Sequence, residues 1–225
     1  THGTVSNPDI VSDLHLSLPT VTNTTRELLE SGLLRDLGEM QSTGGRRARA
    51  LCAASDYRFS IGLDITRNHL GILLLNLTGD IIKYERMQLG FSRSSAYFSE
   101  VCQKIDDFLL ETEISGEQIL GLGISLPGIV DPVQKMITYS HALGVRDLLF
   151  SEIQSYFPWH CTFLNDANAG AFAEGIGSDL PSSFFYLSLS NTVGGAIFHD
   201  GNLLPGDAFR CGEAGHDPDH GKIKT

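Results

Sequence analysis

The first part of the chain carries apolar residues at helical spacing. They form two faces, one made by Ile10, Val11 and Leu14 and the other by Val21, Leu28 and Leu29. Ser6 and Ser17 stand before these segments as N-caps, each with a proline in the following turn, and Gly32 follows as a C′ residue. The pattern predicts two short helices joined by the turn 15–17, which is typical of a helix-turn-helix.

From Tyr57 onward the hydrophobic pattern changes to that of strands. Residues 59–65 alternate, residues 70–75 form a buried run, and a turn follows at 76–80. Residues 101–109 have helical spacing, with Ser99 as the expected cap. Further strands are expected at 119–124, 184–189 and 196–198, and a small-residue helix from Asn168. Because strands and helices interleave, this part is predicted to be α/β.

Charge divides the chain at about the same place. The net charge is −11, but residues 1–55 hold five arginines against six acids, so the excess acidity lies in the remainder. A negative total argues against nucleic-acid binding in general, yet a local arginine cluster can still contact phosphates.

Composition excludes several other classes of protein. The longest apolar run, residues 71–75, is too short to span a bilayer, and no signal peptide is visible, so we expect a cytoplasmic protein without a membrane partner. Four cysteines without a CxxC spacing indicate reduced thiols. Both ends of the chain are expected to be truncated, since it starts without Met and stops after a Gly/His/Asp-rich stretch.

Hydroxyl side chains gather at the start of the second predicted helix. The N-terminal end of a recognition helix meets the bases, so Ser17, Thr20, Thr22 and Arg26 are candidate DNA contacts. The alternative is an ordinary polar helix face.

A glycine-arginine loop follows. Gly44 and Gly45 precede Arg46 and Arg47, which can enter a minor groove or neutralise phosphates. The alternative is a flexible basic linker. Together with a helix-turn-helix, however, the loop predicts DNA binding.

Two further segments carry polar groups suited to a small ligand. Asn165 and Asp166 follow a predicted strand, where a carboxylate can accept a hydroxyl proton and an amide can bind a sugar hydroxyl, although both residue types also serve as N-caps. Glu213 and His216 lie three apart and suit a polyol or a metal, although a lone His is more often structural.

Phosphate-binding loops are poorly represented. Such loops need glycines so that backbone N–H groups approach the anion. Residues 64–68 follow a strand without any glycine, and residues 190–195 have two only at their end. ATP binding is therefore not expected.

The ordered motifs resemble those of the ROK family (repressors, open reading frames, sugar kinases), in its transcriptional repressor branch, similar to xylose and N-acetylglucosamine repressors. The stretches that carry the resemblance are Asp64–Asn68, Leu126–Asp131, Leu164–Asn168, Ser190–Ala196, Gly212–His216 and, as a wing, Gly44–Arg47. The resemblance implies an actin-like (ribonuclease H-like) α/β sugar-kinase fold behind an N-terminal winged helix-turn-helix. It implies three parts: a DNA-binding domain at 1–55, a first lobe at 56–164 and the incomplete start of a second lobe at 165–225.

The resemblance also assigns roles to single residues. It places Gly128, Asn165, Asp166, Glu213 and His216 at a sugar, with Asp166 equivalent to the catalytic base of the family's kinases. It makes His216 the first ligand of a structural zinc ion whose cysteine ligands are not in this sequence.

The chain departs from the family pattern at both phosphate loops, where Ser190 and Thr192 replace glycines of the second, at Ala142, and in the zinc cluster expected after His216. Thr66, Arg67 and Asn68 replace the kinase phosphate motif, which implies loss of ATP binding. Ala142 stands where the family commonly has an Asn before Leu-Gly.

These observations predict a sugar-responsive transcriptional repressor of carbohydrate metabolism genes, not an enzyme. Its expected partners are operator DNA and a sugar effector, and it is expected to form a homodimer or a dimer of dimers in a bacterial cytoplasm. The alternatives are an ATP-dependent kinase of a hexose or N-acetylhexosamine, which Asp166 favours, and a sugar-binding module without a DNA role.

Overall fold

The structure, a computed structural model, describes residues 3–40, 48–177, 180–189 and 193–212. It begins with two helices, α1 (Asn7–Leu14) and α2 (Leu18–Glu30), as predicted. Ser6 caps α1 in a reciprocal capping box with Asp9, and Ser17 caps α2 by accepting the backbone N–H of Thr20. Gly32 follows α2 with a positive φ of 80°, which is the conformation expected of a C′ glycine.

Of these first two helices, only α2 has buried side chains. Val21 and Thr25 are its buried residues, and the Thr25 hydroxyl donates to the carbonyl of Val21. The apolar face predicted for α1 is not buried, since no residue of α1 is buried and Leu14 is 62% exposed. Helical spacing shows which residues share a face, but it does not show whether a neighbour covers that face.

A two-stranded antiparallel hairpin follows the helices. It consists of β1 (Leu34–Glu39) and β2 (Arg49–Ala53), and Val5 pairs with Leu51 on the other side of β2. The hydrophobic pattern did not predict these strands, because β1 buries almost no side chain. The residues at its tip, 41–47, lie outside the described part.

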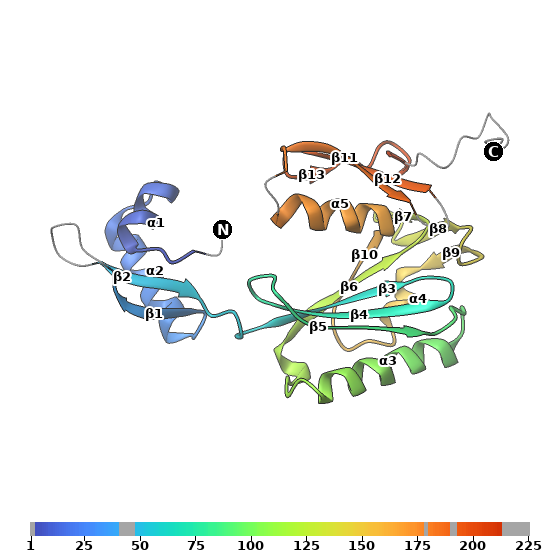
Figure 1. Cartoon of the computed structure of the whole chain (residues 1–225), viewed down its shortest axis with the longest axis horizontal. Helices are drawn as coiled ribbons and strands as arrows, with labels where there is room; N and C mark the ends of the chain where they lie inside the picture. The colour runs from blue at the N-terminus through green and yellow to red at the C-terminus, as the bar shows by residue number, and fades with distance from the viewer. Residues whose placement is uncertain (1–2, 41–47, 178–179, 190–192, 213–225) are drawn as a thin grey trace.

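A five-stranded sheet forms the centre of the α/β part, in the order β10-β6-β3-β4-β5 (Figure 1). Its strands are β3 (Phe59–Ile65), β4 (His69–Asn76), β5 (Ile81–Gln88), β6 (Ile119–Leu126) and β10 (Cys161–Asn165). The first three form an antiparallel meander, whereas β6 and β10 add in parallel to β3. Strands 59–65, 70–75 and 119–124 were predicted from the sequence and are confirmed.

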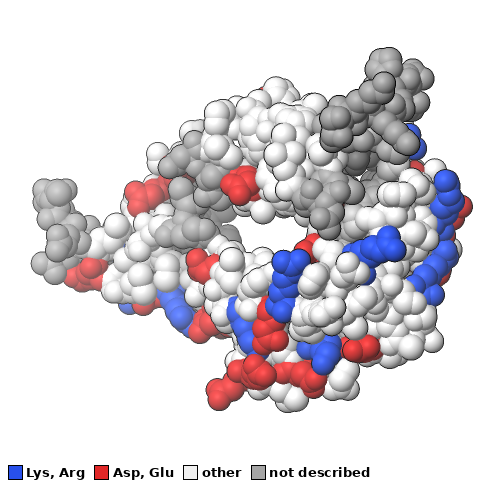
Figure 2. Space-filling model, turned by 45° about the vertical axis from the view of Figure 1, so that its right-hand side comes forward, with Lys and Arg blue, Asp and Glu red and all other residues white. Residues whose placement is uncertain are grey.

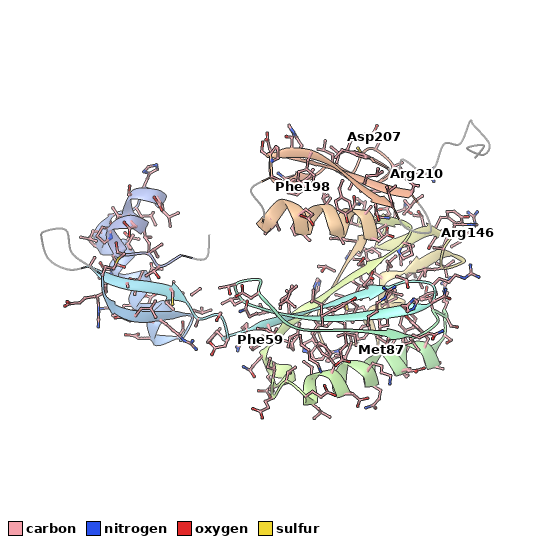
Figure 3. The ribbon with its side chains drawn as sticks, in the orientation of Figure 1. Phe59, Met87, Arg146, Phe198, Asp207 and Arg210 are labelled. Carbon is pink, nitrogen blue, oxygen red and sulfur yellow. The ribbon has the colours of Figure 1, made fainter. Side chains whose placement is uncertain are left out.

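The core lies on one face of this sheet. Helix α3 (Ser95–Leu110) covers that face with Val101, Ile105 and Phe108, which are buried together with the inward residues of β3, β4 and β6, while β5 adds the partly buried Met87. Figure 3 shows Met87 on this side of the sheet. The cap of α3 is Ser94, not Ser99, since an N-cap lies one residue before the helix and the helix starts earlier than its apolar spacing suggests.

Small elements connect the larger ones. They are the 3-10 turn η1 (Gly116–Gln118), the three-stranded sheet of β7 (Ile129–Asp131), β8 (Met136–Ser140) and β9 (Val145–Leu149), and helix α4 (Phe150–Gln154).

The remaining described elements pack around a second, smaller core. Helix α5 (Asp166–Gly177) lies on a sheet of β11 (Ser183–Leu189), β12 (Val193–His199) and β13 (Asn202–Leu203). Gly170 allows α5 to pack closely on β11, because a Cβ at this position would be 2.6 Å from the ring of Tyr186. The small-residue run was therefore predicted correctly as a helix, and its glycines fit helix α5 against the sheet.

Within the described residues no helix is both long and apolar enough to cross a membrane.

Candidate functional site

Three parallel strands end at one edge of the five-stranded sheet. Asp64 on β3 is level with Ser125 on β6, and Leu126 on β6 is level with Asn165 on β10. In open α/β sheets the carboxyl ends of parallel strands are the usual place for ligands. The predicted residues Gly128, Asn165 and Asp166 all lie at this edge.

Asn165 holds the edge together. Its side chain is buried, its Nδ2 donates to the carbonyl of Gly128 over 2.8 Å, and its Oδ1 accepts the backbone N–H groups of Ala167 (2.9 Å) and Asn168 (3.1 Å). The contacts to Ala167 and Asn168 cap α5. The structure therefore shows the N-cap role that the sequence left open, and it adds a link between α5 and the turn after β6.

Gly128 occupies a position that only glycine fits. Its φ is 134°, and a Cβ there would be 2.6 Å from the carbonyl oxygen of Tyr139 and 2.8 Å from the Cβ of Ser140. The turn after β6 is thus pressed against the end of β8. Ser140 starts the turn that contains Ala142, and its hydroxyl accepts the N–H of Leu143. The Arg146 guanidinium lies 4.4 Å from the centre of the Tyr139 ring beside this turn (Figure 3).

Two carboxylates face the same space. Asp166 is the first residue of α5, and burial raises the pKa of its carboxyl. Burial likewise raises the pKa of Asp64, which accepts the Ser125 hydroxyl over 3.4 Å, and the charge of Asp166 raises it further. Arg86 opposes this rise. Figure 2 shows a hollow between the α5 part and the five-stranded sheet.

The sequence reasoning did not assign a ligand role to Asp64. Apolar and polar residues alternate along β3, so the sequence does place Asp64 on the polar face of this strand, near its end. The missing information is that β6 pairs in parallel with β3 and β10 in parallel with β6, which brings Asp64 to the same sheet edge as Ser125 and Asp166, 61 and 102 positions further along.

Part of the predicted site cannot be placed. Glu213 and His216 lie outside the described residues, so their sugar contacts and the zinc ligand role of His216 stay predictions. The described residues contain no group of three or more His, Cys, Asp and Glu side chains that could hold a metal ion.

The stretch in place of the kinase phosphate loop is a tight turn. The Thr66 hydroxyl donates to the carbonyl of His69 and accepts its N–H, both over 3.1 Å. The carbonyls of Arg67 and Asn68 accept the N–H groups of Phe91 and Leu89. An anion would need free backbone N–H donors, but in this turn the N–H of Thr66 donates to the carbonyl of His69 and the N–H of His69 donates to the Thr66 hydroxyl. The second loop, at 190–192, lies outside the described part.

The predicted DNA contacts divide into two groups. The hydroxyls of Ser17 and Thr20 bond to each other over 2.8 Å at the cap of α2, while Thr22 and Arg26 are exposed, with Arg26 donating to the Oδ1 of Asn23. Arg46 and Arg47 lie outside the described residues.

The sequence reasoning overlooked two residues on the same helix. Asn23 and Thr24 are both exposed on α2, and helical spacing places Asn23 opposite the buried Val21 and Thr25 and Thr24 on the flank of that buried face. The acids of α2, Glu27 and Glu30, stand only in its last turn.

The fold and the site define the class: an α/β protein with the actin-like fold of the sugar kinases. The profile of the ROK family matches residues 60–221, and the chain belongs to that family.

Similar proteins include repressors. The xylose repressor of Caldicellulosiruptor bescii is 30% identical over 94% of this chain and 54% of its own length. The DNA-binding transcriptional dual regulator NagC of Escherichia coli K12 is 26% identical over 96% of this chain and 54% of its own length. The chain thus spans about half the length of the curated relatives it matches.

Solved structures confirm the fold. A ROK family transcriptional regulator, a homologue of the E. coli MLC protein, has a TM-score of 0.75 and 23% identity, covering 96% of this chain and 56% of its own. A ROK family glucokinase from Streptomyces griseus, in complex with glucose and AMPPNP, has a TM-score of 0.60 and 20% identity, covering 71% of this chain and 50% of its own.

Proposed function

We propose that this chain is the DNA-reading and sugar-sensing portion of a transcriptional repressor. The observation that carries the proposal is the combination of two features in one chain. The first is a helix-turn-helix in which the N-terminal half of α2 is exposed and carries no acidic residue. The second is an α/β part in which a closed turn stands in place of the phosphate loop. The names of the repressors that it resembles support this proposal.

The DNA-reading part is α1, α2 and the β1–β2 hairpin. In this proposal α2 is the recognition helix and the hairpin is the wing of a winged helix, with Arg46 and Arg47 at its tip. Thr20, Thr22 and Arg26, together with Asn23 and Thr24, meet bases or phosphates, whereas Ser17 caps the helix. Glu27 and Glu30 stay at the far end of α2, away from the phosphates.

The sensing part binds a sugar between its two lobes. Asp166 and Asp64 accept sugar hydroxyls, because carboxylates are acceptors with two oxygens each. Glu213 and His216 complete the contacts, and Asn165 and Gly128 shape the site. The proposal keeps three domains, at 1–55, 56–164 and 165–225. The protein acts in the bacterial cytoplasm as a dimer on a pseudo-palindromic operator. The zinc ion stays a prediction and has no part in this mechanism.

Selection of bound duplexes from a random pool, followed by titration with pentoses, hexoses and N-acetylhexosamines, tests the proposal. We expect enrichment of a pseudo-palindrome and a change of DNA affinity with one class of sugar. Asp166→Asn should abolish the sugar response and leave sugar-free DNA binding intact. Asp106→Asn, on α3 at the opposite face of the sheet, is the control. Sugar binding without any enriched duplex would favour a sugar module with no DNA role.

One observation favours a kinase as the second candidate. A carboxyl whose pKa is raised by burial, at the mouth of a site, suits a general base. A coupled assay of ADP release over the same sugars decides between the two. If the parent releases ADP with one of these sugars and Asp166→Asn abolishes that release, the chain is a sugar kinase and not a repressor that only senses sugar.

A further inference from the structure

One short segment joins the helix-turn-helix part to the α/β part. This connector, residues 54–58, follows β2 and leads into β3 (Figure 1). Its contacts reach both parts, so it is placed to determine how one sits on the other.

The connector is tied to the N-terminal part at three points. Ala54 is buried, and its N–H donates to the carbonyl of Leu33 over 2.9 Å. Asp56 forms an ion pair with Arg35 of β1. The ring of Tyr57 lies 3.4 Å from where a Cβ on Gly32 would stand.

The other side of the connector is tied to the β4–β5 hairpin. The carbonyl of Ser55 accepts the N–H of Leu77 over 2.9 Å. The loop that contains Leu77 is fixed internally, because Asn76 Oδ1 accepts the N–H groups of Thr78 (3.0 Å) and Asp80 (2.8 Å). A movement of this loop therefore acts on the connector as a unit.

The same strands run from the connector to the ligand site. Phe59 pairs with Asn76 at the connector end of β3 and β4, and Asp64 pairs with Gly71 at the site end. Gly71 in turn pairs with Arg86 of β5, whose charge acts on Asp64. The five-residue step along β3 spans about 17 Å of hydrogen-bonded sheet.

We propose that the connector couples the two parts, and that the Arg35–Asp56 pair holds the DNA-reading part in the orientation that binds the operator. The inference rests on the proposed function. Both side chains are more than half exposed, at 54% and 59%. Such a pair contributes little to folding, so it can be exchanged between two orientations without unfolding either part.

The test compares two substitutions of the same kind, one in the connector and one in the β1–β2 hairpin. Asp56→Asn breaks the pair with Arg35, and Asp36→Asn breaks the pair of Asp36 with Arg49, which does not touch the connector. The readout is the factor by which the sugar changes the operator Kd, written as the larger Kd divided by the smaller. The sugar used is the one to which the parent responds. For Asp56→Asn we expect this ratio to fall about two- to five-fold, the range of an exposed ion pair. For Asp36→Asn we expect no change in the ratio.

A second measurement depends on neither ligand. Trypsin should cleave after Arg58 faster in Asp56→Asn than in Asp36→Asn, because the connector is held less firmly. The exchanged pair Arg35→Asp/Asp56→Arg should restore the ratio; its cleavage is not compared, because the exchange adds a trypsin site at position 56.

The outcomes separate the two proposals. A parent protein that binds no operator, or does not respond to sugar, overturns the proposed function and the coupling with it. A responsive parent whose ratio and cleavage rate are the same in the two Asn variants overturns the coupling alone.

Discussion

Single residues at the ligand site serve its architecture before they serve any ligand. The side-chain amide of Asn165 donates to the carbonyl of Gly128 and accepts the first N–H groups of α5, and Gly128 has no room for a side chain. The sequence presents Asn165 and Asp166 as a pair, but the structure separates their tasks. Asn165 positions the turn and the helix, and Asp166 is a partly buried carboxylate at the start of α5 whose charge acts on Asp64.

Gly128→Ala should destabilise the protein by about 3 kcal/mol or more, since it adds an overlap with the end of β8 to a backbone conformation that alanine avoids. Gly79→Ala is the matched control, because Gly79 has a positive φ of 86° with no atom near its missing Cβ. It should lose only about 1–2 kcal/mol. Urea unfolding of both variants measures the difference, and equal losses would contradict the packing argument.

Asp166 should make folding stability fall as the pH rises. Burial raises its folded pKa above the ordinary value, so the folded protein holds the proton more firmly than the unfolded chain. The stabilising contribution is complete below the ordinary aspartate pKa and is lost as the pH rises through the raised value. Asp166→Asn should therefore unfold at a higher temperature than the parent at pH 7.5, with the gain disappearing near pH 4. Calorimetry at several pH values checks this, and a variant that is less stable at pH 7.5 contradicts it.

At the scale of elements, the caps were more informative than the apolar faces. Ser6, Ser17 and Gly32 fixed the ends of α1 and α2 correctly because a cap is a local interaction. The exposure of Leu14 was not foreseen, and β1 was not recognised, because burial there depends on neighbours far away in the sequence. The motifs named Gly128, Asn165 and Asp166 as candidates, whereas Asp64 joins them at the sheet edge only through parallel pairing, which no local pattern contains.

Gly175→Ala tests how α5 fits against its sheet. Alanine favours a helix, but its Cβ would overlap with the ring of Phe198, which is buried and stacked on Phe184. We expect a net loss of about 1–3 kcal/mol. Adding Phe198→Leu, which vacates that space, should recover part of the loss. A double-mutant cycle by chemical unfolding measures the coupling, and simple additivity would contradict the contact.

The wing should control the salt dependence of DNA binding. Arg46→Ala/Arg47→Ala removes two candidate phosphate contacts and should reduce the slope of log K against log salt by about 1.8. Arg26→Ala should reduce it by about 0.9 if Arg26 contacts a phosphate. Lys104→Ala on α3 is the control for charge alone. Fluorescence anisotropy between low and moderate salt gives the slopes, and an unchanged slope in the double variant excludes the wing assignment.

At the scale of the whole molecule, charge and architecture divide together. The near-neutral first 55 residues hold the candidate DNA contacts, and the acidic remainder holds the sheet and the two carboxylates. Acidic surface on the sensing part is repelled by phosphates, which favours binding through the helix-turn-helix part alone. The overall charge of −11 therefore says little about DNA binding, and its distribution says more.

The order of strands in the central sheet also has a kinetic consequence. The β3–β4–β5 meander closes through short loops, whereas the pairing of Asp64 with Ser125 joins residues 61 positions apart, and β10 joins later still in the sequence. Distant pairings form slowly because the chain entropy of a long loop is lost before contacts compensate for it. We therefore expect the meander to fold first and the strand ends that carry the ligand site to assemble last. On the ribosome the connector and its hairpin would be in place before a sugar site exists.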